Sequence, residues 1–238
     1  MNKKDLDKSN YIYDKMAEFE EGTNISKESM RDIISYTKDK SKMVRDDAAN
    51  ALSYFPYEEA EDVLNNLLDD KSWEVKTTAL WSLEIIGKKK QTVDHMIECF
   101  KKDKGILNRS WFASTIPAVI INGDLEKEDY IKKIIELKRN EKVPSVYGAL
   151  VYALISLGKE DYFSEIVVDA ESTNLERVES GFRELRWLAE DGLFLDKISE
   201  IIKAISIPKD KQHIYVNYDI EDTLKTIKQN NEENKKHN

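Results

Sequence analysis

The segment DKSKMVR at residues 39–45 recurs 31 residues later as DKSWEVK at residues 70–76. A weaker copy, DKGILNR, follows at residues 103–109. Each copy lies between two stretches whose apolar residues have helical spacing. Self-similarity at a fixed period of this size is typical of repeat architectures, in which one small unit is stacked several times. The recurrence therefore predicts an array of two-helix units.

Apolar spacing after each copy supports this prediction. Val44, Ala48 and Leu52 fall on one face of a helix,. The same frame recurs over 75–83, 108–116, 146–154 and 178–186. A second set of amphipathic runs precedes these segments, near 30–39, 58–70, 91–103, 128–140 and 161–172, with a last run at 193–205. The predicted fold class is all-α, an α-α superhelix of about five two-helix repeats.

The domain prediction follows the same pattern. Residues 1–205 are expected to form a single α-solenoid, with a capping helix before residue 22 because an end unit would otherwise expose its stacking face. Residues 206–238 are expected to form a C-terminal extension with a short helix and a disordered tail. The short helix rests on the spacing of Ile220, Leu224 and Ile227, and the tail on the polar run 230–238,.

The composition and charge of the chain restrict its fold type and its partners. The chain has 238 residues, a formal net charge of −9, 8 Gly and 4 Pro, which suits a helical protein better than one of strands and tight turns,. A single cysteine excludes an intramolecular disulfide,. No signal peptide or membrane-spanning run is recognisable, so a cytoplasmic location is expected. The acidic balance disfavours nucleic acid as a partner and favours a basic protein.

The repeated residues resemble HEAT repeats, in particular the short variety also found in bilin lyases. The resemblance rests on the pattern D-x4-V-[RK]-x2-A-x3-L in residues 39–52 and 70–83. It implies a ladder of charged hydrogen bonds between neighbouring units, with Asp39 and Arg45, Asp70 and Lys76, and Asp103 and Arg109 as its members. The equivalent later positions are Glu141 with Tyr147 and Thr173 with Glu179, so the ladder is expected to end after the third unit.

The resemblance also implies that the second helix of each unit lines a concave side. If the 0, +4 and +8 positions are buried, the +2, +6 and +9 positions lie opposite. The predicted partner-binding residues are Trp81, Tyr152, Trp187, Asp46, Asp47, Asn50, Glu84 and Glu184. Packing between helices is the alternative for the aromatic residues, since a frame error of one residue would bury them. Trp73 and Trp111 are interpreted as structural.

Catalytic, metal and cofactor motifs are not recognisable. His95 and Cys99 are four residues apart on a predicted helix, and we interpret them as core residues rather than a catalytic pair. The enzyme alternative is a HEAT-like DNA glycosylase for alkylated bases, which the segment around Trp111 faintly resembles. No carboxylate stands between Lys104 and Gly123 to stabilise a sugar cation, which argues against it.

The expected function is therefore non-catalytic protein binding. HEAT-repeat proteins that resemble this chain serve as bacterial immunity proteins, and we expect an acidic, aromatic face to cover a basic toxin domain. The alternative is a scaffold or adaptor for an endogenous complex. A second copy of the chain stays open as a partner, since exposed aromatic residues suit a homo-oligomer equally well.

Overall fold

The computed structural model describes residues 3–55, 59–205, 207 and 213–236, and the regular structure of these residues is helical. Contacts within the chain divide it into two units, Met1–Lys127 and Glu128–Asn238. We call them the N-terminal and C-terminal units and describe each by itself. The helices predicted from apolar spacing are all present, so the all-α prediction is confirmed.

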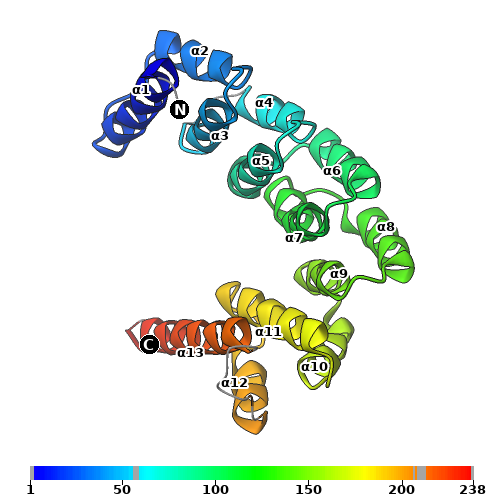
Figure 1. The fold of residues 1–238 in the computed structure, drawn as a ribbon. Coiled ribbons are helices and arrows are strands. Elements are labelled where there is room, and N and C mark those ends of the chain that lie inside the picture. Colours follow the sequence, from blue (N-terminus) through cyan, green and yellow to red (C-terminus); the bar gives the residue numbers. More distant parts are fainter. Residues whose placement is uncertain (1–2, 56–58, 206, 208–212, 237–238) are drawn as a thin grey trace. The chain divides into compact units, whose positions relative to one another are not determined.

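The N-terminal unit consists of two rows of helices. Its elements are α1 (Lys3–Glu20), α2 (Lys27–Tyr36), α3 (Lys42–Ala51), α4 (Ala60–Leu67), α5 (Trp73–Ile86), α6 (Lys90–Lys102) and α7 (Ile106–Asn122). Helices α1, α3, α5 and α7 contact one another in sequence order, and α2, α4 and α6 pack on their other side (Figure 1). The chain thus alternates between the two rows, as expected for stacked two-helix repeats.

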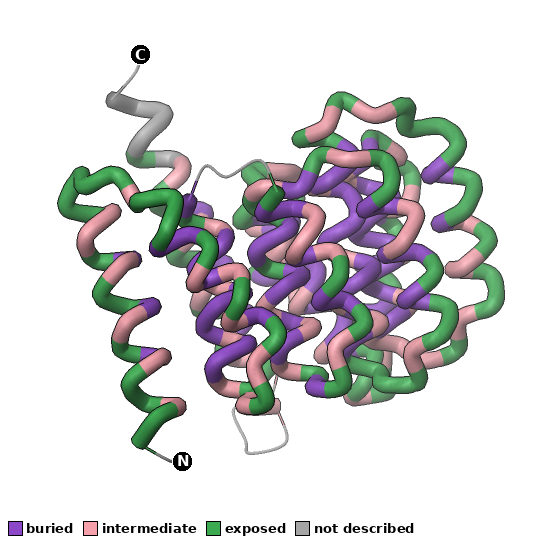
Figure 2. The backbone as a smooth tube through the Cα atoms, turned by 90° about the horizontal axis from the view of Figure 1, so that it is seen from above, coloured by how far each residue is buried: buried purple, intermediate pink, exposed green. Residues whose placement is uncertain are grey.

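The buried face of the second helix in each repeat is the one that the sequence predicts. Val44, Ala48 and Leu52 are buried, as are their equivalents in α5 and α7. Figure 2 shows how buried residues recur along each helix and alternate with exposed ones. Stacking the repeats removes these apolar side chains from water, which is the main favourable contribution to folding.

The turns between paired helices are joined by a charged contact. Arg45 donates from Nε and Nη2 to the two carboxylate oxygens of Asp70, at 2.7 and 2.8 Å. Its Nη1 donates to the backbone carbonyl of Asp39 at 2.9 Å, so one guanidinium holds two consecutive turns. Burial would raise the pKa of Asp70, but the hydrogen bonds from Arg45 and from the backbone N–H of Ser72 hold that pKa below its usual value,.

The same contact recurs on both sides of this pair. Lys8 of α1 pairs with Asp39, and Lys76 of α5 pairs with Asp103 at 2.9 Å. Each of the three aspartates also accepts a backbone N–H two residues further on, which fixes its turn. The ladder that the resemblance implied for Asp39, Asp70 and Asp103 is therefore present, with Lys8 of the first helix as an additional member.

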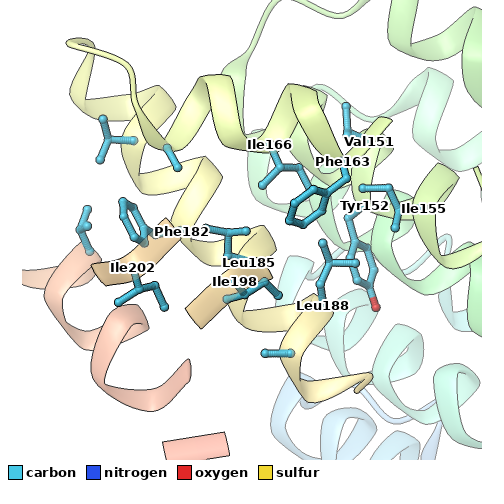
Figure 3. Packing of buried hydrophobic residues seen from close by; sticks show 14 of the residues in the cluster. Val151, Tyr152, Ile155, Phe163, Ile166, Phe182, Leu185, Leu188, Ile198 and Ile202 are labelled. Carbon is cyan, nitrogen blue, oxygen red and sulfur yellow. The ribbon is translucent and has the colours of Figure 1, made fainter. Parts of the chain in front are cut away.

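The C-terminal unit repeats the two-row arrangement. Its elements are α8 (Lys127–Asn140), α9 (Pro144–Ser156), the 3-10 helix η1 (Glu160–Tyr162), α10 (Phe163–Ala170), α11 (Leu175–Glu190), α12 (Leu195–Ala204) and α13 (Ile214–Lys236). Helix α11 contacts both α9 and α13, while α10 and α12 pack on the other side. Figure 3 shows Phe163, Tyr152 and Leu188 pointing toward one another from three different helices of this core.

The turn before α9 departs from the ladder. Glu141 keeps the capping role, because its Oε1 accepts the backbone N–H of Val143 at 2.8 Å. Tyr147 stands where the ladder has Arg or Lys, and its hydroxyl donates to Glu165 of α10. Lys138 of α8 also donates to Glu165, at 2.8 Å. A Lys–Tyr–Glu cluster between helices takes the place of the Arg–Asp pair here.

Helix α13 is longer than the short helix that the sequence predicts, and it includes most of the segment predicted to be a disordered tail. It is 23 residues long, and the tail is helical as far as Lys236. Val216, Thr223 and Ile227 are buried, and Arg186 of α11 donates to Asp219 at 2.8 Å. Helix α13 thus packs mainly against α11 and also contacts α12. Residues 206, 208–212 and 237–238 lie outside the described residues, and a domain boundary at 205/206 stays a prediction.

Removing Arg45 is expected to destabilise the N-terminal unit more than removing Lys76. Arg45 is 4% exposed, so Arg45→Met leaves the carboxylate of Asp70 buried without its partner, at a cost of about 3 kcal/mol in the free energy of unfolding,. Lys76→Met is the matched control and should cost about 1 kcal/mol or less, because the Lys76 side chain is 22% exposed,. Urea unfolding measures both, and equal losses would contradict the ranking.

Candidate functional site

In the N-terminal unit, the row formed by α1, α3, α5 and α7 has a stripe of side chains that are not buried. On α5 the residues that are not buried include Thr78, Trp81 and Ile85, spaced three and four residues apart on one side of the helix,. The stripe continues at equivalent positions of the neighbouring helices. We call it the tryptophan surface and define it by Asp46 and Asn50 of α3, Thr78, Trp81, Glu84 and Ile85 of α5, and Trp111, Ser114 and Ala118 of α7.

Contacts between helices fix the relative positions of these residues. Thr78 donates from its hydroxyl to Asp46 at 2.6 Å, which joins α5 to α3. Trp81 and Trp111 meet edge to face, with ring centroids 5.5 Å apart and an interplanar angle of 89°. This arrangement is a favoured one for aromatic pairs, since the positive edge of one ring meets the negative face of the other. The stripe is therefore a single surface with a fixed geometry.

The tryptophan surface has two large, exposed apolar side chains on α5. Trp81 is 47% exposed and Ile85 is 66% exposed. Asp46 is half-buried and Glu84 is exposed, so two carboxylates belong to the same surface. An apolar patch bordered by polar residues is typical of a protein-interaction site. The structure thus brings together Trp81, Asp46, Asn50 and Glu84 of the predicted set.

The two tryptophans interpreted as structural, Trp73 and Trp111, differ in their exposure and in their contacts. Trp111 is half-buried and supports Trp81, and because its ring borders the solvent it belongs to the tryptophan surface. Trp73 is the first residue of α5, is 52% exposed and lies outside the tryptophan surface, so its structural role stays a prediction. The sequence frame missed Trp111 because the stripe on α5 and α7 includes the +3 and +10 positions, one residue away from the predicted +2 and +9 positions.

Asp47 was predicted to border the binding face, and this is wrong. It is 8% exposed and accepts hydrogen bonds from the hydroxyls of Ser9 and Tyr13, the latter at 3.0 Å. Both donors belong to α1. Asp47 belongs to α3, so its carboxylate joins α1 to the first repeat.

In the C-terminal unit the predicted aromatic residues pack against each other. Tyr152 is 8% exposed, which contradicts an exposed position; its hydroxyl donates to Asp191 at 2.8 Å. Its ring lies 5.4 Å from that of Trp187, and the guanidinium of Arg183 lies 5.0 Å from the Trp187 ring. Trp187 is half-buried. The prediction failed for Tyr152 because α9 is covered on more than one face.

Glu184 is fully buried, so its predicted exposed position is wrong. Its carboxylate accepts from the hydroxyl of Ser180 at 2.9 Å and from Nε of Arg183 at 3.0 Å. The space that it occupies depends on Gly148 of α9, where a Cβ would lie 2.6 Å from Oε2 of Glu184. Burial raises the pKa of Glu184 to about 7, although Arg183 and Ser180 oppose the shift,.

Comparisons with known proteins agree with this architecture. Residues 30–116 match the family of HEAT repeats. Among solved structures the chain is similar to the complex of CpcE and CpcF of phycocyanin lyase from Nostoc sp. PCC7120, with 18% identity, a TM-score of 0.50 and coverage of 83% of each chain. An engineered protein matches at 14% identity and a TM-score of 0.36, over 85% of this chain and 61% of that one. No curated protein sequence matches the chain.

The resemblance to HEAT repeats is thereby confirmed for residues 30–116, and the predicted fold class, an all-α superhelix, is confirmed as well. At this level of identity the phycocyanin lyase structure establishes the fold alone. Among the described residues, none of the helices combines the length and the apolar character needed to cross a bilayer.

The buried carboxyl group of Glu184 is expected to make stability fall as pH rises. Its pKa is about 7 in the folded chain against an ordinary value of 4.5, so the folded state holds a proton that the unfolded state releases,. The free energy of unfolding should therefore decrease between about pH 4.5 and pH 7. Glu184→Gln stays neutral and should lose less stability over this range.

Urea unfolding at several pH values measures this difference. Glu200→Gln, at an exposed position of α12, is the matched control and should follow the original protein at each pH. A parallel pH dependence for Glu184→Gln and the original protein would show that Glu184 does not titrate in this range.

Proposed function

We propose that this protein binds another protein through the tryptophan surface. The observation that carries the proposal is the half-exposed ring of Trp81, held in place by Trp111 at 5.5 Å. Tryptophan is enriched at the few interface positions that supply most of the binding energy. A ring that is already fixed in the free protein loses little conformational freedom on binding, so more of its contact energy contributes to affinity.

The charge of the chain favours a basic partner. The formal net charge is −9, and the proposed surface includes the carboxylates of Asp46 and Glu84. Complementary charge raises the rate of encounter more than the final affinity. A basic patch on the partner, around an apolar residue that contacts Trp81, would match this arrangement.

Toxin immunity is the more specific form of this proposal. In that case the partner is a basic toxin domain, the binding takes place in the bacterial cytoplasm, and the tryptophan surface covers the region that the toxin uses on its own substrate. An endogenous complex, in which the protein acts as an adaptor, is the alternative. The related fold in the CpcE and CpcF complex also occurs in an assembly of two proteins, which supports protein binding without identifying the partner.

The surface can be tested by a pair of tryptophan substitutions on one helix. The protein is immobilised, its partners are captured from the native cytosol, and the affinity of the most abundant one is measured. Trp81→Ala is expected to weaken it about thirtyfold or more, as for a residue worth about 2 kcal/mol. Trp73→Ala is the matched control, because Trp73 is exposed on the same helix but lies outside the tryptophan surface, and should retain the affinity.

Equal affinity of the Trp81→Ala variant and the original protein would contradict the proposed surface. The identity of the captured protein separates the two forms of the proposal: a toxin domain supports immunity, and a component of a cellular complex supports the adaptor. Excision of alkylated bases from DNA by the purified protein would support the glycosylase alternative instead.

The association rate should depend on salt if the carboxylates attract the partner. We expect it to fall as ionic strength rises, since salt screens exposed charges beyond about 10 Å at 0.1 M. Asp46→Asn with Glu84→Gln should make this dependence less steep and leave the dissociation rate nearly unchanged. Surface plasmon resonance at several salt concentrations measures both rates. An association rate that does not respond to salt would remove the electrostatic part of the proposal.

A further inference from the structure

Three side chains of metal-binding type meet between α4 and α6 of the N-terminal unit. His95 and Cys99 come from α6, and Asp69 follows the end of α4. One ligand atom from each of them lies within 4.8 Å of the other two. His95 Nε2 is 3.1 Å from Asp69 Oδ2, and Cys99 Sγ is 3.8 Å from Asp69 Oδ1. The tryptophan surface includes none of the three.

The register of the two helices explains why these side chains meet. His95 and Cys99 are four residues apart and share a face of α6. Helix α6 runs alongside α4 in the same direction, so contacts recur at each turn. The contacts in order are Glu61 with Thr92, Asn65 with His95, and Asp69 with Cys99. The last two of these turns place an imidazole and a thiol beside one carboxylate.

The hydrogen bonds of His95 point to a cation at this position. Its Nδ1 lies 3.0 Å from the side-chain oxygen of Asn65, and its Nε2 lies 3.1 Å from the carboxylate of Asp69. Both neighbours are acceptors, but a neutral imidazole has only one N–H to donate. With that N–H on Nδ1, the lone pair of Nε2 faces the carboxylate, and a cation between them satisfies both. A carbonyl oxygen that accepts from the second ring nitrogen is the usual way of orienting a histidine ligand.

We propose that Asp69, His95 and Cys99 bind one divalent metal ion of the zinc class. Thiolate, imidazole and carboxylate are the ligands that Zn²⁺ takes in proteins, and three of them leave a fourth, tetrahedral position for water. Ligands at zinc bond lengths lie roughly 3.5 Å apart. The separations of 3.1 and 3.8 Å from Asp69 to the other two ligands come close to this, and the Asp69 side chain is 71% exposed, so its carboxylate can adjust to the ion.

Binding requires the thiol of Cys99 to lose its proton. Burial raises the pKa of this thiol to about 11, and the carboxylate of Asp69 adds to the effect. The incoming ion forms a bond to sulfur, and the proton passes to solvent. Lys76 and Lys102 lie near enough to Cys99 to favour the thiolate. The charge of Lys76 is balanced by Asp103 at 2.9 Å, which limits its repulsion of the metal ion.

Cobalt(II) provides a direct test with the reduced, full-length protein. Titration with cobalt chloride is expected to produce a near-ultraviolet thiolate-to-cobalt charge-transfer band that saturates at one ion per chain and disappears when zinc chloride is added. Cys99→Ser should abolish the band. His95→Gln and Asp69→Asn should each weaken cobalt binding at least tenfold. His213→Gln, which removes a histidine of the C-terminal unit, is the matched control and should leave the titration unchanged.

A second measurement guards against loss of folding in the variants. Each variant is first required to show the helical circular dichroism of the original protein, and zinc is then expected to raise the thermal midpoint of the original protein and of His213→Gln, but not of Cys99→Ser. Absence of the charge-transfer band in the original protein would overturn the proposal. So would equal cobalt affinity in the original protein and the folded His95→Gln and Asp69→Asn variants.

Discussion

The contact of Arg45 with two consecutive turns sets the geometry of the N-terminal unit. Apolar side chains bring the helices together, but burial of area has no direction and would tolerate sliding of one repeat against the next. The guanidinium has a planar, forked set of donors, and it meets both oxygens of Asp70 and a carbonyl of the preceding turn,. This contact fixes the register of α3 against α5, on which the hydrogen bond between Thr78 and Asp46 of the tryptophan surface depends. The pair of Lys76 and Asp103 has the same role for the next repeat.

The fold could be predicted from the sequence because the same spacing of charged and apolar residues occurs in several repeats. The position of Val44 relative to Asp39 recurs in the next repeat, and each copy indicates the same buried face. The length of α13 was underestimated because this helix lacks the repeat pattern. Its buried residues also include Thr223 and Asp219, whose polar side chains predict an exposed position. Asp219 is buried because Arg186 pairs with it, and a pairing between residues 33 positions apart cannot be seen in local spacing.

The binding residues were harder to predict, since their exposure depends on which neighbour covers a helix. Trp81 and Tyr152 occupy the same position in their repeats, yet one is half-exposed and the other is buried. Glu184 also reads as a surface acid, and only the missing side chain at Gly148 on another helix makes room for it. Likewise, His95 and Cys99 were interpreted as core residues because their third neighbour, Asp69, comes from a different helix and is 26 positions distant from His95.

Helix α1 has fewer buried residues than the helices that follow it in its row. Ser9, Ile12 and Met16 are buried, against six residues each in α3 and α5. Its other contacts are hydrogen bonds to the carboxylates of Asp39 and Asp47 and edge-to-face contacts of its aromatic rings. Elements with few buried apolar contacts open at the smallest free-energy cost. The N-terminal end is thus the natural starting point for fraying, and its backbone amides would exchange with solvent long before those of α5.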